Sequence, residues 1–217
     1  MNHDHLQQKI KSMYGELGYT DGWRFLYSSR KTLAPATTTV LLGLNPGGTG
    51  ESVTEDQRIK YSCESGSAYT SEIWAGVSPA GTSPLQRQIG LLCEAIEVDI
   101  EQVLAGNLVP FRSKNWAKLR EKKASLRFGI NLWSLVLETV QPDRVFAFGT
   151  TQRKLFASAL GISSSLETAS VNWGNQKAYL GRSGSTTLAV LPHFSRYKLF
   201  GRKHGKSKPF TDWIGSL

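Results

Sequence analysis

Apolar residues recur along the chain in two patterns, short unbroken runs and longer stretches with helical spacing. The unbroken runs have the length of buried strands and lie at 38–44, 103–109, 143–149, 177–182 and 186–191. The stretches that place apolar side chains on one helical face lie at 4–17, 83–96, 125–141, 150–161 and 209–214. Strands that alternate with helices predict an α/β fold with a central, mostly parallel sheet flanked by helices.

Several helix ends are marked by capping and stop signals. Ser83 is followed by Pro84, which is typical of an N-cap and a first helical turn. Pro142 is expected to stop the helix before it. Thr150 or Thr151 is expected to cap the next helix, and Gly161 to close it.

Nothing in the chain divides it into separate domains. Residues 1–217 contain no repeat and no long linker, so we expect one domain, with 1–36 as an N-terminal helical extension. Residues 49–82 are rich in Ser, Gly, Thr and Tyr and have weak periodicity. This composition predicts a long, variable loop region beside a pocket.

The charge balance changes the picture, because it favours a polyanionic partner. The chain carries 26 Lys plus Arg against 17 Asp plus Glu, a formal net charge of +9, with a pI near 9.6. Lys, Arg and two aromatic residues crowd the segment "RYKLFGRKHGKSK" at 196–208. Such a run is most often a solvated loop, but within this charge balance it favours nucleic acid as the partner.

The remaining composition restricts the cellular setting and the cofactors. Cys63 and Cys93 lie in no zinc or iron–sulfur spacing, and we expect both to be free thiols. The first residues have no apolar signal sequence, and no run is long enough to span a membrane. We expect a cytoplasmic monomer with no metal, no cofactor and no membrane partner.

Polar side chains follow three of the predicted strands. Asn45 follows the first strand, Asn107 ends the second and His193 follows the last. Since the ligand crevice of a parallel sheet lies beyond the carboxyl ends of its strands, these side chains are expected around one mouth. Each also has a plainer interpretation: a turn at Asn45, a strand-end cap at Asn107 and a structural histidine at His193.

Four segments resemble motifs of the uracil-DNA glycosylase superfamily, in the superfamily order. "GLNPGG" at 43–48 is similar to the first motif of the mismatch-specific and single-strand-selective branches, which have an Asn-Pro-Gly core. "GNLVPFRSKN" at 106–115 resembles the base-reading segment, and "PDRVFAFGTTQRKLF" at 142–156 the strand and helix that follow it. "LPHFSRYKL" at 191–199 resembles the last motif with its DNA-inserting loop. The resemblance covers roughly residues 38–200.

The resemblance implies a three-layer fold and a monofunctional DNA N-glycosylase of base-excision repair, which flips a pyrimidine out of DNA and leaves an abasic site. Asn45 would position the attacking water or face the sugar, and His193 would stabilise the charge on the departing base. Asn107 would pair with the base edge, and Tyr69 would stack on the base, with Tyr61 as its rival. Gly43 and Leu44 would complete the base pocket.

The resemblance also implies a DNA-contacting loop at 194–208. Tyr197, Leu199 or Phe200 would wedge into the vacated stack. Together with Tyr197, the residues expected to contact DNA are Arg112, Ser195, Arg196, Lys198, Arg202 and Lys203.

The sequence departs from the superfamily at Phe194, which replaces the usual proline after the histidine. Uracil is the default substrate, and a bulky, phage-type modified cytosine is the alternative, since 49–82 leaves the pocket undefined. A catalytically silent DNA-binding member is a further alternative. A nucleotide-phosphate loop is disfavoured, because no Gly-Lys-Ser or Gly-Lys-Thr follows "GLNPGG".

Overall fold

A six-stranded sheet forms the centre of the protein in the computed structural model, which describes residues 3–48, 58–74, 76 and 79–217. In spatial order the strands are β4 (Leu104–Asn107), β2 (Thr39–Gly43), β5 (Arg144–Phe148), β8 (Thr186–Leu191), β7 (Lys177–Ser183) and β6 (Glu167–Ser170). The first four are parallel, and β7 and β6 continue the sheet antiparallel to β8. The four parallel strands therefore present their carboxyl ends at one edge, as expected.

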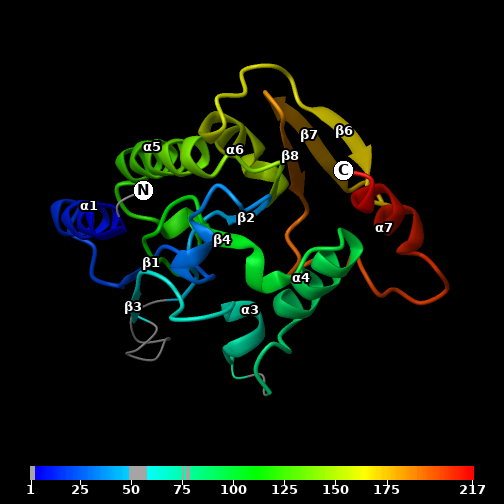
Figure 1. The fold of residues 1–217 in the computed structure, drawn as a ribbon, viewed down its shortest axis with the longest axis horizontal. Helices are drawn as coiled ribbons and strands as arrows, with labels where there is room; N and C mark the ends of the chain where they lie inside the picture. The colour runs from blue at the N-terminus through cyan, green and yellow to red at the C-terminus, as the bar shows by residue number, and fades with distance from the viewer. Residues whose placement is uncertain (1–2, 49–57, 75, 77–78) are drawn as a thin grey trace.

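Helices cover both faces of this sheet and make a three-layer sandwich (Figure 1). On one face lie α1 (His3–Glu16), α5 (Lys122–Val140) and α6 (Arg153–Ala159). On the other lie α3 (Ala68–Ser71), α4 (Pro84–Ala95) and α7 (Lys208–Gly215). The single-turn helices are η1 (Arg30–Thr32), η3 (Ile100–Gln102), η4 (Trp116–Lys118) and η5 (Thr150–Gln152). A small parallel pair, β1 (Trp23–Arg24) with β3 (Ile59–Lys60), lies outside the main sheet.

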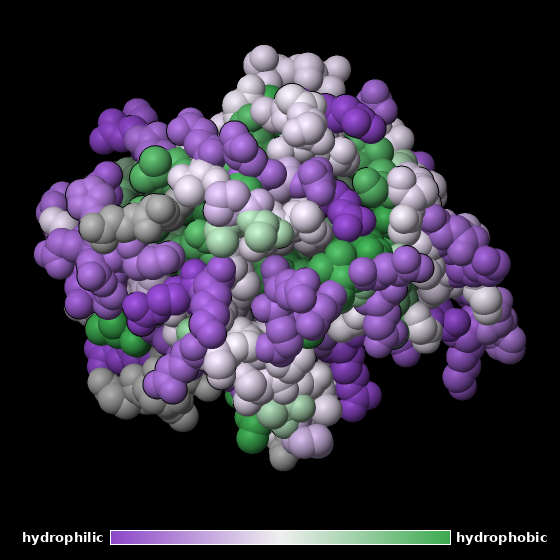
Figure 2. Space-filling view, viewed as in Figure 1, coloured by the Kyte–Doolittle hydropathy of each residue, from purple (hydrophilic) through white to green (hydrophobic). Residues whose placement is uncertain are grey.

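Successive side chains of the strands enter different cores. Val40 and Leu42 of β2 pack among α1, α5 and α6, which we call the α5-side core, whereas Leu41 packs among α3, α4 and α7, the α4-side core. Because side chains alternate along a strand, a strand covered on both faces must be apolar throughout. This requirement explains the unbroken run at 38–44. Most of the surface in Figure 2 is hydrophilic, with hydrophobic side chains visible in narrow strips.

The predicted α/β fold is confirmed, and most of its helix boundaries have the expected cause. Ser83 caps α4 through a capping box with Gln86, and Pro84 occupies the first turn. At the end of α5, Gln141 takes a left-handed φ of 51° immediately before Pro142. No helix in the described ranges has the length and apolar character needed to cross a membrane.

The local structure differs from the sequence-based expectation in three places. The helix expected from Thr150 begins as η5, and α6 has no side-chain cap at Gln152. Strands β1 and β6 were not predicted, because their runs of two and four residues show no apolar pattern. The region 49–82 is not a continuous loop, since β3 and α3 lie within it. Residues 49–57, 75, 77 and 78 of that region lie outside the described residues.

Candidate functional site

The loops after β2 and β4 extend the pairing of these strands into the candidate site. Gly43 and Asn107 are register partners at the last position of the ladder. Beyond it, the backbone N–H of Leu108 donates to the Gly43 carbonyl at 2.8 Å, and Val109 N–H donates to the Leu44 carbonyl at 2.9 Å. Ser113 N–H reaches the Pro46 carbonyl at 3.3 Å. The two loops are therefore held together by main-chain bonds that depend on no side chain.

Asn107 presents a buried amide with an unused donor. The residue is 5% exposed, and its Nδ2 has no hydrogen-bond partner among the described residues. Its backbone is fixed, because its N–H donates to the Phe25 carbonyl and its own carbonyl accepts from Trp133 Nε1 at 2.7 Å. A buried donor without a partner costs roughly 1–3 kcal/mol, so such groups are rare unless a ligand satisfies them.

Gly43 makes room for that amide. A Cβ atom at position 43 would lie 2.3 Å from Asn107 Oδ1, closer than any two such atoms approach. The side chain of Asn107 therefore occupies the volume that a larger residue on β2 would need. This contact gives a physical reason for glycine at the end of the apolar run.

The amide of Asn45 is oriented by its own loop and by the loop after β4. Its Nδ2 donates both to the Pro46 carbonyl at 3.1 Å and to Ser113 Oγ at 2.9 Å. Ser113 Oγ in turn donates to the Asn115 carbonyl at 2.9 Å. Because both N–H groups are used, Oδ1 is the end of the amide that is left to accept a hydrogen bond from a water or a substrate.

His193 is held as a neutral imidazole after β8. The backbone N–H of Ser195 donates to Nδ1 at 3.3 Å, and Ser195 Oγ lies 2.8 Å from the same atom. Since a backbone N–H can only donate, Nδ1 is the acceptor and the ring proton lies on Nε2. Burial, and then the positive charge of Arg196, lower the pKa of His193 below its ordinary value. The ring therefore offers one neutral N–H donor at neutral pH.

The three side chains lie at the same edge of the sheet, and β5 separates the two asparagines from His193. Asn45 and Asn107 follow adjacent strands, and His193 follows β8, two strands from β2. At the spacing of neighbouring strands, this separation is about 10 Å. The end of β5 is bonded to the end of β8 through Gly149 N–H and the Leu191 carbonyl at 2.9 Å.

Phe194 and Gln88 anchor the loop that carries His193. The Phe194 ring is buried, with its centroid 4.8 Å from that of Phe148 and 5.8 Å from that of Phe200. From α4, Gln88 Oε1 accepts from Phe200 N–H at 2.9 Å and Nε2 donates to the Phe200 carbonyl at 3.2 Å. Phe194 thus ties the loop to the α4-side core.

The alternation of β4 separates the two tyrosines considered for base stacking. Ala105 faces the α4-side core, so Asn107, two residues further along, points to the same face. Tyr69 packs in that core, whereas Tyr61 packs in the α5-side core against Phe25. Tyr69 is the better placed of the two, although it is buried to 6% exposure.

An aromatic and charged cluster surrounds Tyr69. Its ring stacks on Tyr27 at 5.8 Å and meets the edge of Trp74 at 5.2 Å. The Arg24 guanidinium lies 4.1 Å from the centroid of the Tyr27 ring and forms two hydrogen bonds to Glu72, at 2.7 and 2.9 Å. Trp74 Nε1 also donates to Glu72, at 3.0 Å. The sequence gives no sign of this cluster, because Arg24 and Glu72 are far apart along the chain.

Glu72 is charged in spite of its burial. Burial raises the pKa of its carboxyl, but hydrogen bonding and the charge of Arg24, with smaller contributions from Trp74 and Lys60, outweigh burial and lower the pKa to about 2. Lys60 Nζ lies 2.9 Å from the carboxylate. The network connects β1, β3 and the end of α3 behind the aromatic cluster.

The residues expected to contact DNA are found in different surroundings. Ser195, Arg196, Lys198 and Lys203 are exposed, and Tyr197 is half-buried with its ring edge-on to Trp173. Arg202 is held by the carbonyls of Asn172 and Lys206. Leu199 and Phe200 are buried, which disfavours both as the wedge and favours Tyr197 of the three.

Arg112 and Leu44 also have structural surroundings. Arg112 is 4% exposed, and its guanidinium donates to the carbonyls of Gly47 at 2.9 Å and Arg58 at 3.3 Å. This geometry favours a role in holding the loop after β2 over contact with a phosphate. The Leu44 side chain packs against the α5-side core, and its backbone carbonyl accepts the bond from Val109 N–H.

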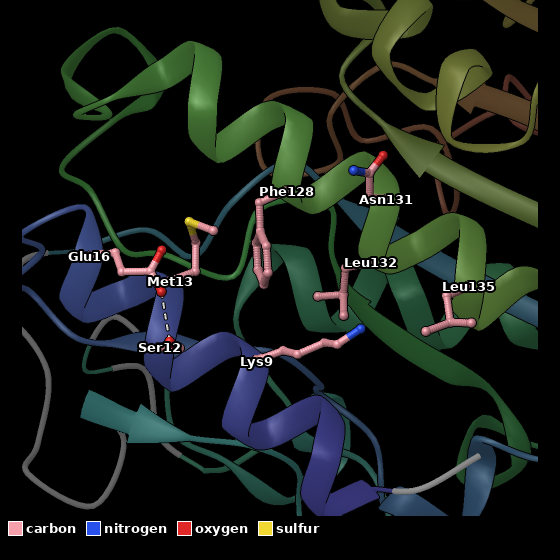
Figure 3. Close-up of a pocket in the computed structure, with 8 residues that line it drawn as sticks. All are labelled: Lys9, Ser12, Met13, Glu16, Phe128, Asn131, Leu132 and Leu135. Atoms are coloured by element: carbon pink, nitrogen blue, oxygen red, sulfur yellow. Dashed lines mark hydrogen bonds between the residues drawn. The ribbon is translucent and has the colours of Figure 1, made fainter.

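Two surface hollows lie away from these residues. One, of about 350 Å³, lies between α1 and α5, where Phe128 and Leu132 point toward Met13 (Figure 3). The other, of about 420 Å³, lies beside Cys93 on α4. Cys63 and Cys93 are free thiols, as expected, and both are buried. Within the described ranges, no group of three His, Cys, Asp or Glu side chains is arranged to hold a metal ion.

No protein-family model matches the chain, and no curated protein matches it.

Proposed function

We propose that the protein is a monofunctional DNA N-glycosylase acting on a flipped pyrimidine. The observation that carries this proposal is the buried Asn107 amide, which has an unused donor and lies above Gly43. A buried site built to hydrogen-bond its substrate leaves such a group unpaired until the substrate arrives. An amide suits a nucleobase edge, because its donor and acceptor lie in one plane.

The chemistry assigned to Asn45 and His193 follows from the charges of the reaction. Breaking an N-glycosidic bond develops positive charge on the sugar and negative charge on the base. His193 is neutral and has an available Nε2–H, so it can donate to the anionic base without giving up its proton. One such donor supplies roughly 3 kcal/mol of transition-state stabilisation.

Asn45 orients the attacking water and does not act as its base. With both Nδ2 hydrogens engaged, its Oδ1 accepts a hydrogen bond from the water and sets the direction of attack. A neutral amide is too weak a base to remove the proton, so leaving-group stabilisation supplies much of the rate. The water oxygen bonds to the sugar carbon as the carbon–nitrogen bond breaks, and the base departs as an anion with the bonding electrons. The proton that the water gives up then neutralises the departed base, directly or through solvent, so that the products are an abasic sugar and a neutral free base.

Tyr69 and the exposed basic residues complete the proposal. Tyr69 forms the wall on which the base stacks, backed by Tyr27 and Trp74. Arg196, Lys198 and Lys203 contact phosphates, and Tyr197 fills the gap that the flipped base leaves. Uracil is the default base, and a bulky modified cytosine remains the second candidate substrate.

The test is a panel of end-labelled oligonucleotides, single- and double-stranded, that carry uracil, mismatched thymine, hypoxanthine or modified cytosines. After incubation, alkali cleaves the strand wherever a base has been removed. We expect product with at least one pyrimidine substrate and no strand cleavage before alkali. The identity of the substrate distinguishes uracil from the modified cytosines.

Three variants show whether the activity belongs to this site. Asn45→Ala and His193→Ala are each expected to lower the single-turnover rate by about 100-fold, in line with the loss of one catalytic hydrogen bond. Asn131→Ala, on α5 beside the hollow of Figure 3, is the matched control and should keep the full rate. DNA binding without base removal on any substrate would favour the catalytically silent alternative.

A further inference from the structure

A second basic segment begins at the end of the base-reading segment 106–115 and has no role in the proposed function. Between Lys114 and Arg127 the chain reads "KNWAKLREKKASLR", with Glu121 as its only acidic residue. Its six positive residues are Lys114, Lys118, Arg120, Lys122, Lys123 and Arg127. The segment contains η4 and the first turns of α5. We call residues 114–127 the α5 arm.

Most of these positive charges are free to meet an anionic partner. Lys114, Lys118, Lys123 and Arg127 are exposed, and no ion pair involves them among the described residues. Arg120 differs, because its guanidinium donates to the Gly18 carbonyl at 3.0 Å and so attaches the arm to the end of α1. The arm is therefore anchored in the fold while its lysines face solvent.

An aromatic ring lies among these lysines. Trp116 is half-buried against the α5-side core, and Lys122 Nζ lies 5.5 Å from the centroid of its ring. The Asn115 side chain fixes the turn by accepting from Lys118 N–H at 3.1 Å. A partly exposed indole within a basic surface is the combination that binds unpaired nucleotides, whose bases stack while their phosphates pair with lysines.

The arm is joined to Asn45 by two consecutive hydrogen bonds. Asn45 Nδ2 donates to Ser113 Oγ, and Ser113 Oγ donates to the carbonyl of Asn115, the residue before Trp116. The arm therefore begins beside Asn45, after β4, whereas the basic loop 194–208 follows β8 beyond β5. The candidate site lies between two basic segments.

We propose that the α5 arm binds the single-stranded DNA that flanks the flipped nucleotide, with Trp116 stacked on an unpaired base and Lys114, Lys118 and Lys123 on the phosphates. This inference deepens the proposed function and rests on it for the choice of DNA as partner. A DNA strand held by both basic segments would cross the edge of the sheet that carries Asn107, Asn45 and His193.

The first test measures the salt dependence of binding to a labelled single-stranded oligonucleotide by fluorescence anisotropy. The triple variant Lys114→Gln, Lys118→Gln, Lys123→Gln is compared with Lys11→Gln, Lys31→Gln, Arg182→Gln, which removes as many exposed charges away from the arm. We expect the arm variant to reduce the slope of log affinity against log salt by about 2, at roughly 0.7 for each lost phosphate contact. The control should keep the slope, and equal slopes in the two variants would overturn the proposal.

The second test concerns Trp116. Wild-type binding is compared on oligonucleotides that carry a stable abasic analogue at each position beside the target. We expect about a tenfold loss of affinity at one flanking position, which is typical of losing one stacked base. Trp116→Leu keeps apolar packing, binds the intact strand about tenfold more weakly and should be insensitive to the abasic position. Full sensitivity in Trp116→Leu would overturn the stacking role.

These measurements separate the arm from the chemistry, because binding is measured without base removal. If no substrate of the panel loses a base but the arm variant still reduces the salt dependence of DNA affinity, the glycosylase proposal is wrong and DNA binding by the arm is supported. If a base is removed but the arm variant has the same salt dependence as its control, DNA binding by the arm is wrong and the glycosylase proposal is supported.

Discussion

The two halves of the candidate site are built in different ways. After β2 and β4, main-chain bonds hold the two loops together, and the amides of Asn45 and Asn107 are held within this framework. After β8, the chain from His193 to Lys208 is largely exposed and basic. It is attached through a few anchors, chiefly Phe194 and the two bonds from Gln88 to Phe200.

The two halves are therefore sensitive to different kinds of substitution. The β2–β4 half holds polar groups in a low-dielectric environment, where one misplaced atom or one unpaired charge costs several kcal/mol. In the β8 half, the charges around His193 are exposed and screened, so changing one of them has small and salt-dependent effects.

The buried ion cluster behind Tyr69 gives the largest expected effect. Glu72→Gln leaves the Arg24 guanidinium, which is 2% exposed, without its charged partner. Breaking a buried pair in this way costs about 3–5 kcal/mol of the free energy of unfolding, measurable by urea denaturation. The matched control is Asp212→Asn, which removes the exposed partner of Lys208 and should change stability by less than about 0.5 kcal/mol. Equal losses of unfolding free energy in Glu72→Gln and Asp212→Asn would contradict the contrast between buried and exposed charges.

The lowered pKa of Glu72 predicts that the protein loses stability in acid. The pKa of Glu72 in the folded protein is about 2, below its ordinary value of 4.5. A lowered folded pKa stabilises the protein above the unfolded pKa, and this stability is lost as pH falls from about 4.5 toward 2. The difference corresponds to about 3 kcal/mol. Wild type should approach the stability of Glu72→Gln across this window, and parallel pH curves for the two proteins would contradict the assignment.

Gly43→Ala should damage the chemistry more than the fold. The new Cβ would lie 2.3 Å from Asn107 Oδ1, so the amide must rotate away from its position above β2. We expect the single-turnover rate of base removal to fall by about 100-fold, as with the loss of one well-placed hydrogen bond. Gly47→Ala, in the same loop, is the control, because its Cβ would meet no atom of the described residues within 4 Å. A normal rate in Gly43→Ala would show that the position of the Asn107 amide is unimportant.

The sequence predicts the polar residues of the β2–β4 half better than it predicts the buried residues that support the site. The alternation of strands and helices predicts a parallel sheet whose carboxyl ends share one edge, and so places Asn45, Asn107 and His193 together there. The order of the strands within the sheet does not follow from this pattern. The sequence could not predict that Phe200 and Arg112 are buried, since their surroundings come from distant segments. Arg24 and Glu72 gave no signal, because a pair between a two-residue strand and a short helix has no periodicity.

Gln88→Leu tests how firmly the β8 half is anchored. The substitution removes both bonds to Phe200 and leaves a buried backbone N–H and carbonyl without partners. We expect a loss of about 2 kcal/mol in the free energy of unfolding and faster proteolysis within 194–208. Gln8→Leu, on the exposed surface of α1, should change neither quantity. An unchanged proteolysis rate in Gln88→Leu would show that Phe194 suffices as the anchor.

Arg196→Gln gives the smallest expected effect, because it acts on His193 through an exposed charge. Burial and the charge of Arg196 both lower the pKa of His193, so the neutral donor is lost only below the ordinary value of 6.5. Removing the arginine raises that pKa, which moves the acid limb of the rate profile to higher pH, and less so at high salt. Arg196→Lys keeps the charge and should keep the profile, whereas Lys203→Gln removes an equal charge that does not influence the pKa of His193. A shift of the same size in Lys203→Gln would mean that the acid limb reports the overall charge of the loop and not the contact between Arg196 and His193.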